Sequence, residues 1–327
     1  MSFRGSGRHT DMTITGIDET AFAARVEPHR RELHVHCYRL LGSFDDAEEM
    51  VQETFLRAWR GRSTFAERAT LRAWLYRIAT NACLDLLARR PKVVSPDGEV
   101  SWLQPYPDEL LDAVASPEAG PEAEAVARET IELTYLVAVQ HLPPRSRAVL
   151  ITRDVLGWRA KDVAELLGIS VAAVNSHLQR ARGRVKEHLP EARAEWPAGE
   201  DACAAERELV QRYMDASEQG DAWAVAEMLT EDVRFTMPPV PGVWAGRDTV
   251  VRSWLEGGFG STEFGAIRCV AVRANRQPAV ANYLRKPGGT EFRAMALDVL
   301  RIADGAVAEI VTFDDDRFAA FGLPEIL

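Results

Sequence analysis

The sequence of 327 residues has no apolar run near the roughly 18 residues that a membrane-spanning helix requires, which argues against a membrane protein. Residues 1–17 also lack the apolar core of a signal peptide, and we expect them to form a disordered lead. The four cysteines, Cys37, Cys83, Cys203 and Cys269, are far apart and form no CxxC pair. Their spacing indicates neither a zinc ribbon nor a disulfide framework. We therefore expect reduced thiols, no metal, no cofactor and a cytoplasmic location.

Basic residues are absent from residues 93–127, which contain eight Asp or Glu residues. The stretch from Arg57 to Lys92 is the reverse, with nine Arg or Lys residues against Glu67 and Asp85. The formal net charge of −10 argues against a nucleic-acid partner only as an average over the chain. Because the two signs are segregated, the sequence still predicts a local basic footprint for phosphates.

Periodicity and composition divide the chain into segments. Helical spacing of apolar residues dominates the first part and returns after a segment rich in proline and acid, which has the composition of an extended linker. Towards the C-terminus, helices give way to alternating strands separated by turns, which predicts an α+β domain. The segments are a lead (1–17), a helical module (18–92), an acidic linker (93–125), a second helical module (126–190), a short linker (191–202) and a C-terminal domain (203–327).

Two features of the first module suggest contacts with other molecules. In "FDDAEEMVQETFLRAW", an apolar stripe (Ala47, Met50, Val51, Thr54, Phe55, Ala58) leaves Glu49, Gln52, Glu53 and Leu56 on the opposite face. In the basic block, Phe65, Trp74 and Tyr76 interleave with arginines, a pattern that suits stacking of unpaired bases and tracking of their backbone. The alternative is that Trp74 and Tyr76 are core residues, and Trp74 fits both interpretations equally well. Asn81, Asp85 and Arg89 form a polar stripe on the following helix.

The second module contains a helix-turn-helix pattern around Gly168-Ile169-Ser170, with Ser170 as the expected N-cap of the second helix. Its expected inner face comprises Val163, Leu166, Leu167, Ile169, Val171, Val174, Leu178 and Val185. Its outward face presents Ala172, Ala173, Ser176, Gln179 and Arg180, followed by Arg182, Arg184 and Lys186. Short residues suit entry into a major groove, Gln and Arg suit base edges, and the later cations suit phosphates. An ordinary bundle with solvated arginines is the alternative.

The two helical segments together resemble the extracytoplasmic-function sigma factors of the sigma-70 family. "YRLLGSFDDAEEMVQETFLRAWRGRSTFAERATLRAWLYRIATNACLDLLARR" is similar to their region 2, and "LPPRSRAVLITRDVLGWRAKDVAELLGISVAAVNSHLQRARGRVKEHL" to their region 4. The resemblance implies a transcription initiation factor that binds the RNA polymerase core, through the β′ clamp helices and the β flap, and the promoter −10 and −35 elements. It also implies that the acidic linker threads the RNA-exit path.

The resemblance assigns roles to particular residues. Core polymerase binding falls on Asp46, Glu49, Gln52, Glu53 and Leu56. Binding of the −10 element as a single strand falls on Arg62, Thr64, Phe65, Arg68, Arg72, Trp74, Arg77, Asn81, Asp85, Arg89 and Arg90. Reading of the −35 element as duplex falls on Ala172, Ala173, Ser176, Gln179, Arg180, Arg182, Arg184 and Lys186.

The C-terminal segment resembles the SnoaL-like, ketosteroid-isomerase-like fold, a cone-shaped curved sheet around helices that usually holds an apolar pocket. The expected strands are Val233–Met237, Glu263–Arg273, Val280–Lys286, Glu291–Ile302 and Val307–Phe313, with "PPVPGVW" as a loop and Asp248 as a helix cap. On strand 291–302 we expect Asp298 to share one face with Phe292, Ala294, Ala296, Leu300 and Ile302. The expected pocket is lined by Tyr213, Met237, Trp244, Trp254, Asp298 and Phe313.

Asp298 is a weak candidate for a catalytic acid, because all seven histidines lie at or before His188 and a His-Asp pair within the domain is excluded. Sensing of a small-molecule ligand and a structural or regulatory docking role are the other interpretations. The favoured function is a non-catalytic sigma factor whose fused domain modulates its activity. The alternative is a SnoaL-like enzyme or small-molecule-binding protein that keeps the sigma-like modules as a scaffold. Two basic faces favour the sigma factor.

Overall fold

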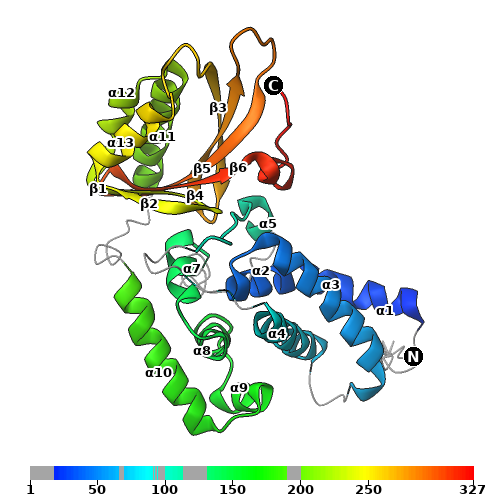
Figure 1. The fold of residues 1–327 in the computed structure, drawn as a ribbon. Coiled ribbons are helices and arrows are strands. Elements are labelled where there is room, and N and C mark those ends of the chain that lie inside the picture. Colours follow the sequence, from blue (N-terminus) through cyan, green and yellow to red (C-terminus); the bar gives the residue numbers. More distant parts are fainter. Residues whose placement is uncertain are drawn as a thin grey trace, which may run out of the picture.

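The computed structural model describes residues 18–65, 70–90, 92, 94, 100–112, 131–189 and 200–327. Two helical modules lie together, and a C-terminal domain built on a curved sheet is stacked on them (Figure 1). The predicted multidomain fold is thus confirmed. None of the described helices is long and apolar enough to cross a membrane. The predicted disordered lead lies outside the described residues.

The first module packs four helices, three of which begin at a side-chain cap. The side-chain oxygens of Asp18, Ser43 and Thr70 accept hydrogen bonds from backbone N–H groups of the first turn, which otherwise lack partners. The predicted apolar stripe is confirmed, with Phe55 half-buried and its other members buried. The elements are α1 (Glu19–Val26), η2 (Glu27–His29), α2 (Arg30–Leu41), α3 (Phe44–Gly61), η3 (Arg62–Thr64) and α4 (Leu71–Arg89).

The sequence predicted an extended acidic linker, but the linker is not extended throughout. Its described part, 100–112, folds back onto α2 and contains a helical turn, α5 (Asp108–Asp112). Val100, Leu103 and Tyr106 are buried, and the Trp102 indole donates a hydrogen bond to the Leu41 carbonyl. The reason is local composition, because "VSWLQPY" supplies enough apolar surface to leave water despite the acids on either side.

The second module contains α7 (Leu133–Gln140), α8 (Pro144–Leu150), a π-helical turn η4 (Ile151–Val155), α9 (Ala160–Leu167) and α10 (Val171–His188). The helix-turn-helix of α9 and α10 is confirmed. Gly168 ends α9 with φ of 63°, and the Ser170 hydroxyl accepts from the Ala173 N–H at 3.1 Å. Val171, expected on the inner face, is 43% exposed and occupies the first position of α10, where fewer helical neighbours cover it.

The C-terminal domain places helices against a six-stranded sheet of order β2-β1-β6-β5-β4-β3. Strand β2, which runs through "VPGVWA", was predicted as loop, and it pairs with β1 at the edge of the sheet, where prolines are tolerated. The helix at 247–256 begins at Gly246 with no side-chain cap, so the prediction that Asp248 caps it is wrong. The elements are α11 (Glu200–Gln219), α12 (Ala222–Ala226), β1 (Leu229–Met237), β2 (Val240–Ala245), α13 (Arg247–Glu256), β3 (Ala266–Ala274), β4 (Gln277–Arg285), β5 (Arg293–Ala303), β6 (Ala306–Asp314) and η6 (Asp315–Phe321).

The two faces of this sheet belong to different cores. One face packs with α11 and α13 through residues such as Tyr213, Val250 and Leu300. The other face, which includes Leu297 and Phe313, joins a continuous core with both helical modules and the linker. The C-terminal domain is therefore docked on the helical half rather than tethered beside it (Figure 1).

Candidate nucleic-acid and polymerase interface

The polar face of α3, predicted to bind the polymerase core, is exposed along much of its length. Leu56 is 50% exposed and stands among mostly polar residues on this face of the helix. Gln52 and Glu53 contact Glu48 and Arg57 on the same helix, whereas Glu49 lies 3.5 Å from Arg90 at the end of α4. Asp46 differs, because its carboxylate pairs with the half-buried Lys92.

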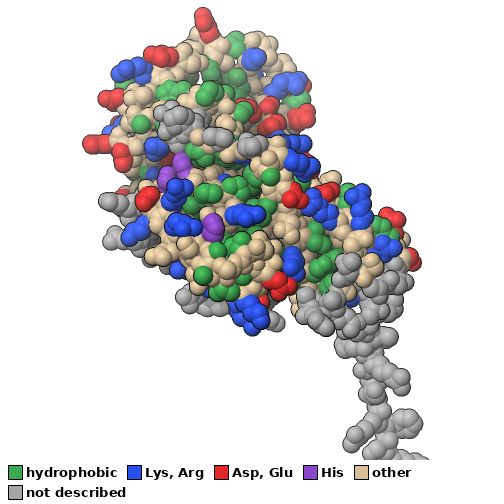
Figure 2. All heavy atoms as spheres, turned by 60° about the horizontal axis from the view of Figure 1, so that its bottom comes forward, with side chains coloured by type: hydrophobic (Ala, Val, Ile, Leu, Met, Phe, Trp, Pro, Cys, Tyr) green, Lys and Arg blue, Asp and Glu red, His purple; other side chains and the backbone are tan. Residues whose placement is uncertain are grey.

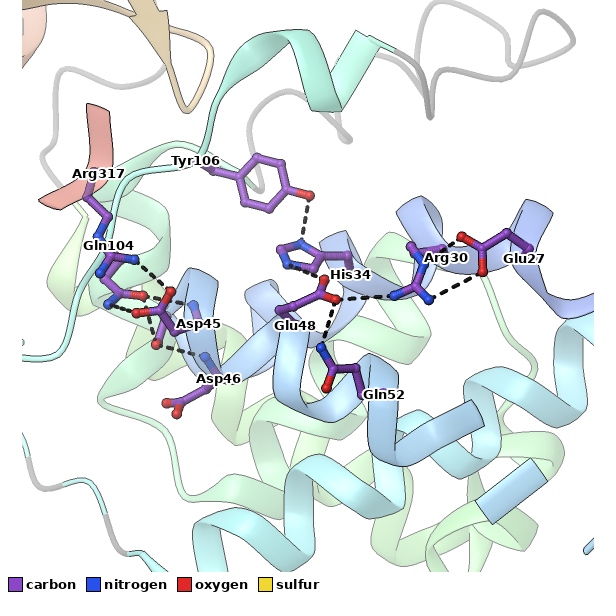
Figure 3. Close-up of polar contacts among 11 residues, drawn as sticks. Glu27, Arg30, His34, Asp45, Asp46, Glu48, Gln52, Gln104, Tyr106 and Arg317 are labelled. Atoms are coloured by element: carbon purple, nitrogen blue, oxygen red, sulfur yellow. Dashed lines mark hydrogen bonds and ion pairs between the residues drawn. The ribbon is translucent and has the colours of Figure 1, made fainter. Parts of the chain in front are cut away.

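The C-terminal domain reaches the N-terminal end of this α3 face (Figure 3). Arg317 of η6 donates to the Asp45 carboxylate at 2.7 Å, and this interaction lowers the pKa of Asp45. Gln104 of the linker donates to the same carboxylate at 3.0 Å and accepts from the Ser43 hydroxyl. Asp45 therefore ties α3 to both the linker and the C-terminal domain, a role the sequence did not predict.

The residues predicted to bind the −10 element surround η3 and α4. The Arg62 guanidinium stacks on the Trp59 ring at 3.7 Å, and Phe65 packs on the half-buried Trp74 with ring centroids 5.1 Å apart. Arg68 and the Thr64 side chain lie outside what the structure describes. Tyr76 was expected among the base-stacking aromatics, but it is buried and its hydroxyl bonds to Glu32, so it cannot stack on a base.

The arginines of α4 are exposed, but several are already paired with acids. Arg72 bonds to Glu32 at 2.6 Å, and Arg90, just after the helix, lies 3.5 Å from Glu49. Asn81 is half-buried, whereas Asp85 and Arg89 are exposed, so the predicted polar stripe faces outward in part. Asp85 pairs with Arg57 at 2.6 Å. The pairs of Asp85 with Arg57 and of Glu49 with Arg90 are exposed, and such pairs are individually weak.

Helix α10 presents the predicted −35 residues on one side. Ala172, Gln179, Arg180, Arg182, Arg184 and Lys186 are exposed, while Ala173 and Ser176 are half-buried. Arg182 is held by two hydrogen bonds to Asp154, of 2.8 and 2.7 Å, which fixes its guanidinium against η4. Figure 2 shows Lys and Arg side chains interspersed with hydrophobic ones on the face that the helical half presents. The N-terminal end of α10 lies far from the C-terminal domain (Figure 1).

The two helical modules touch through the predicted DNA-binding helix α4. Arg77 lies 3.3 Å from Glu165 of α9, so one member of the predicted −10 site is paired with the helix-turn-helix. Deeper in, the buried Arg147 of α8 donates to the Leu40 carbonyl of α2 and to the carbonyls of Gln140 and Leu142. The sequence did not predict this joint, because its partners are separated by up to 107 residues.

The turn between β3 and β4 (Ala274–Gln277) is inserted between the linker and the second module. Asn275, fully buried with φ of 56°, exchanges two hydrogen bonds with the Tyr106 backbone, of 2.8 and 2.9 Å. Its side-chain amide donates to the Tyr38 hydroxyl at 2.8 Å and to the Ile131 carbonyl at 2.7 Å. One side chain thus contacts the first module, the linker and the start of the second module.

Neighbouring groups reinforce this turn. Asp108 of the linker accepts from the Arg276 N–H at 2.7 Å and lies 3.3 Å from Arg273. The Gln277 side chain accepts from the Leu133 N–H at 3.0 Å, at the start of α7. "ANRQP" signalled a turn in the sequence, but no local pattern indicated that its asparagine would be buried between domains.

At the position of the predicted pocket, the Asp298 carboxylate lies in a hydrogen-bond network with three residues of the same domain. Its carboxylate accepts from Tyr213 at 3.1 Å, Asn282 at 2.8 Å and Thr312 at 2.5 Å. Burial raises the pKa of Asp298, and the three donors oppose this rise. Arg252, considered as a partner in the sequence, is not among its bonded residues.

Met237, Trp244 and Trp254, predicted to line a cavity with Tyr213, pack with it in one hydrophobic core. Phe313 does not join them, because it pairs with Leu297 and so faces the helical modules. Phe292 and Ala294 were expected on the same face as Asp298. Like Phe313, they lie instead on the face towards the helical modules. An irregularity in the β4–β5 register, between Asn282 and Tyr283, reverses the alternation there.

Comparison with known proteins agrees with this architecture. Three family models match the chain in order: Sigma-70 region 2 over residues 25–92, Sigma-70 region 4 over 133–185 and the SnoaL-like domain over 210–310. The ECF RNA polymerase sigma factor SigG of Mycobacterium tuberculosis is 40% identical over 323 residues, covering 94% of this chain and 85% of SigG. SigJ of the same organism is 30% identical, covering 90% of this chain and 93% of SigJ.

The crystal structure of Mycobacterium tuberculosis SigJ matches the fold with a TM-score of 0.62 at 26% identity, covering 92% of this chain and 100% of that one. The chain is therefore a sigma factor, a protein of transcription initiation. It belongs to the extracytoplasmic-function (ECF) RNA polymerase sigma factors and carries a fused SnoaL-like domain.

Proposed function

We propose that the SnoaL-like domain restrains promoter-directed transcription by docking on both helical modules at once. The observation that carries this proposal is the buried Asn275, whose hydrogen bonds join α2, the linker and the residues before α7. A buried amide with all these groups satisfied is costly to withdraw, because each partner would lose its hydrogen bond. The domain therefore stabilises one arrangement of the modules against others.

The docked arrangement differs from the one that promoter binding requires. The −10 and −35 elements are separated by about 25 base pairs, or roughly 85 Å of duplex at about 3.4 Å per base pair. In the docked chain, by contrast, Arg77 of the −10 site touches Glu165 beside the −35 helix. The modules must separate to reach both elements. Undocking of the β3–β4 turn contributes to the free energy that this separation requires.

We assign the binding surfaces accordingly. The α3 face with Asp46, Glu49, Gln52, Glu53 and Leu56 binds the β′ clamp helices, and the second module binds the β flap. The surface around η3 and α4 binds the unpaired −10 strand, and the outward face of α10 reads the −35 duplex. The sites of action of such a factor lie in the cytoplasm.

We assign no catalytic reaction to the SnoaL-like domain. The Asp298 carboxylate accepts from three donors within the fold, and it lines neither the cavity beside Leu87 and Arg147 nor the one beside Gly220 and Gly260. A general base needs a free lone pair directed at a substrate proton. The network instead supports a structural role for Asp298.

Run-off transcription with core polymerase tests the restraint. Asn275→Gly removes the amide without straining the backbone, because glycine accepts a positive φ. We expect about fivefold or more transcript relative to the wild type, the low end of typical coupling free energies. Asp304→Gly is the matched control, since Asp304 also has a positive φ, of 51°, but lies in the exposed β5–β6 turn. Equal transcription by Asn275→Gly and wild type contradicts the restraint, and no promoter-dependent transcript from the wild type contradicts the promoter-binding assignments.

A further inference from the structure

A cavity of about 350 Å³ lies at the joint between the two helical modules. Leu87 near the end of α4 forms one side, together with Lys92 and Val94 just beyond this helix. Residues 140–144 and Arg147 of the second module form the other side. Small-molecule sites typically measure about 300–1,000 Å³, so this cavity is large enough to hold a metabolite.

The charged side chains that line the cavity are all cationic among the described residues. Lys92 and Arg147 are the formal cations, and Gln140 and His141 add polar groups. Lys92 pairs with Asp46, which stands outside the lining. Arg147 adds to the electrostatic cost of the Lys92 charge, so the two cations lie within range of each other.

The charge on Arg147 has no described carboxylate to balance it. This side chain is 2% exposed, and its hydrogen bonds go to backbone carbonyls and to the Gln140 side-chain oxygen, which are neutral groups. Burial lowers the pKa of Arg147 to about 10, so the guanidinium still carries its charge at neutral pH. A buried cation with no counter-ion among the described residues, beside a cavity, creates a positive potential that favours an anion.

We propose that this cavity binds a small phosphate-bearing metabolite. Lys92 serves as a compact cationic donor for the phosphate, and Arg147 supplies the second positive charge behind it. Leu87, Val94 and the Pro143–Pro144 step offer an apolar wall for the rest of the molecule. Because the lining comes from both modules, a bound ligand would also hold them in the docked arrangement.

Isothermal titration calorimetry of the full chain with pyrophosphate, in a chloride buffer of constant ionic strength, tests this site. We expect saturable binding at a single site. Lys92→Gln should weaken it by about tenfold or more, whereas Lys92→Arg, which keeps the charge, should retain it. Lys161→Gln is the matched control, because Lys161 is exposed on α9 and does not line the cavity.

Lys92→Gln also removes the Lys92–Asp46 ion pair, so a second variant tests whether that loss alone explains weaker binding of pyrophosphate. Val94→Glu adds an acid to the lining and leaves that pair intact, so it should abolish binding in a chain whose circular dichroism is unchanged. Absence of saturable binding by the wild type overturns the proposal. Equal weakening by Lys92→Gln and Lys161→Gln overturns it as well, since this would mark general surface attraction. No polymerase or promoter enters the measurement, so its outcome is independent of the proposed restraint.

Discussion

Arg77 on α4 and Glu165 on α9 form an ion pair between the two sigma modules, with Nη1 and Oε1 3.3 Å apart. Both side chains are largely exposed, at 45% and 68%, so the pair adds little to folding stability. Its consequence is competition, because Arg77 cannot hold Glu165 and a DNA phosphate in the same geometry.

Glu165→Gln should therefore strengthen binding of a −10 single strand without changing the midpoint of thermal unfolding. We expect a modest gain of about two- to fivefold, in keeping with the small free energy of an exposed pair. Fluorescence anisotropy with the polymerase complex and a labelled −10 oligonucleotide measures it. Glu208→Gln, on the exposed face of α11, is the control for loss of one negative charge. A gain of the same size in both variants would show that net charge, not the pair, is responsible.

Asp298→Asn should destabilise the SnoaL-like domain by about 1–3 kcal/mol. Its amide N–H group would replace a carboxylate oxygen and would then face a donor group, with which it cannot form a hydrogen bond. The difference should also depend on pH. Since burial raises the folded-state pKa of Asp298, the folded state binds the proton more tightly than the unfolded state. Stability of the wild type relative to Asp298→Asn should then increase as the pH falls through the raised pKa, levelling off below the ordinary value of 3.8.

Urea unfolding at a series of pH values measures this difference. The control is Asp304→Asn, an exposed acid in the adjacent β5–β6 turn. If the wild type lost stability relative to Asp298→Asn on acidification, the carboxylate would have to be stabilised as an anion by its three donors.

Ser170→Ala should destabilise the helix-turn-helix by about 1 kcal/mol through loss of the N-cap of α10. Hydrogen exchange of the first turn of α10 should accelerate, and binding of a −35 duplex should weaken if this turn enters the major groove as proposed. Ser170→Asp keeps a capping oxygen and should restore both measurements. Failure of Ser170→Asp to restore slow exchange would argue that the hydroxyl acts elsewhere.

Arg180→Ala and Arg182→Ala should differ, although both remove one exposed arginine from α10. Arg180 bonds only to Ser176 on its own helix, so it is available to a base edge, and its loss should cost about 1–3 kcal/mol of −35 binding. Arg182 is committed to Asp154, and its loss should cost less in DNA binding and more in thermal stability. Electrophoretic mobility shifts on matched and mismatched −35 duplexes separate the two effects. Equal losses on both duplexes would reduce Arg180 to a phosphate contact.

Local patterns predicted the elements wherever one physical rule governed them. The apolar stripe of α3 and the Ser170 cap were visible because helical spacing and capping act within a few residues. Strand β2 was missed because a proline and a glycine within it, after two further prolines, normally indicate a loop, whereas pairing at the sheet edge tolerates them. Phe292 and Ala294 were assigned to the wrong face because a single register irregularity reverses strict alternation.

The candidate site was less predictable, because its parts depend on contacts across long stretches of sequence. Tyr76 resembles a base-stacking aromatic until Glu32, forty-four residues earlier, is placed beside its hydroxyl. Asn275 is an ordinary turn residue in the sequence and becomes an interdomain contact only through Tyr106 and Tyr38. The linker likewise appears unstructured from its acids, although its aromatic residues decide its packing.

The continuous core that joins both modules to one face of the sheet also sets an order of events during synthesis. The helical modules leave the ribosome first, and Phe313 on β6 is made long after His188 ends α10. At about 5–20 residues per second, the intervening chain takes roughly 6–25 s to appear. Throughout that interval the newly made modules expose the apolar surface that the sheet later covers, and they carry no docked domain. If the docked domain restrains transcription as we propose, each molecule passes once through an unrestrained state before its SnoaL-like domain docks.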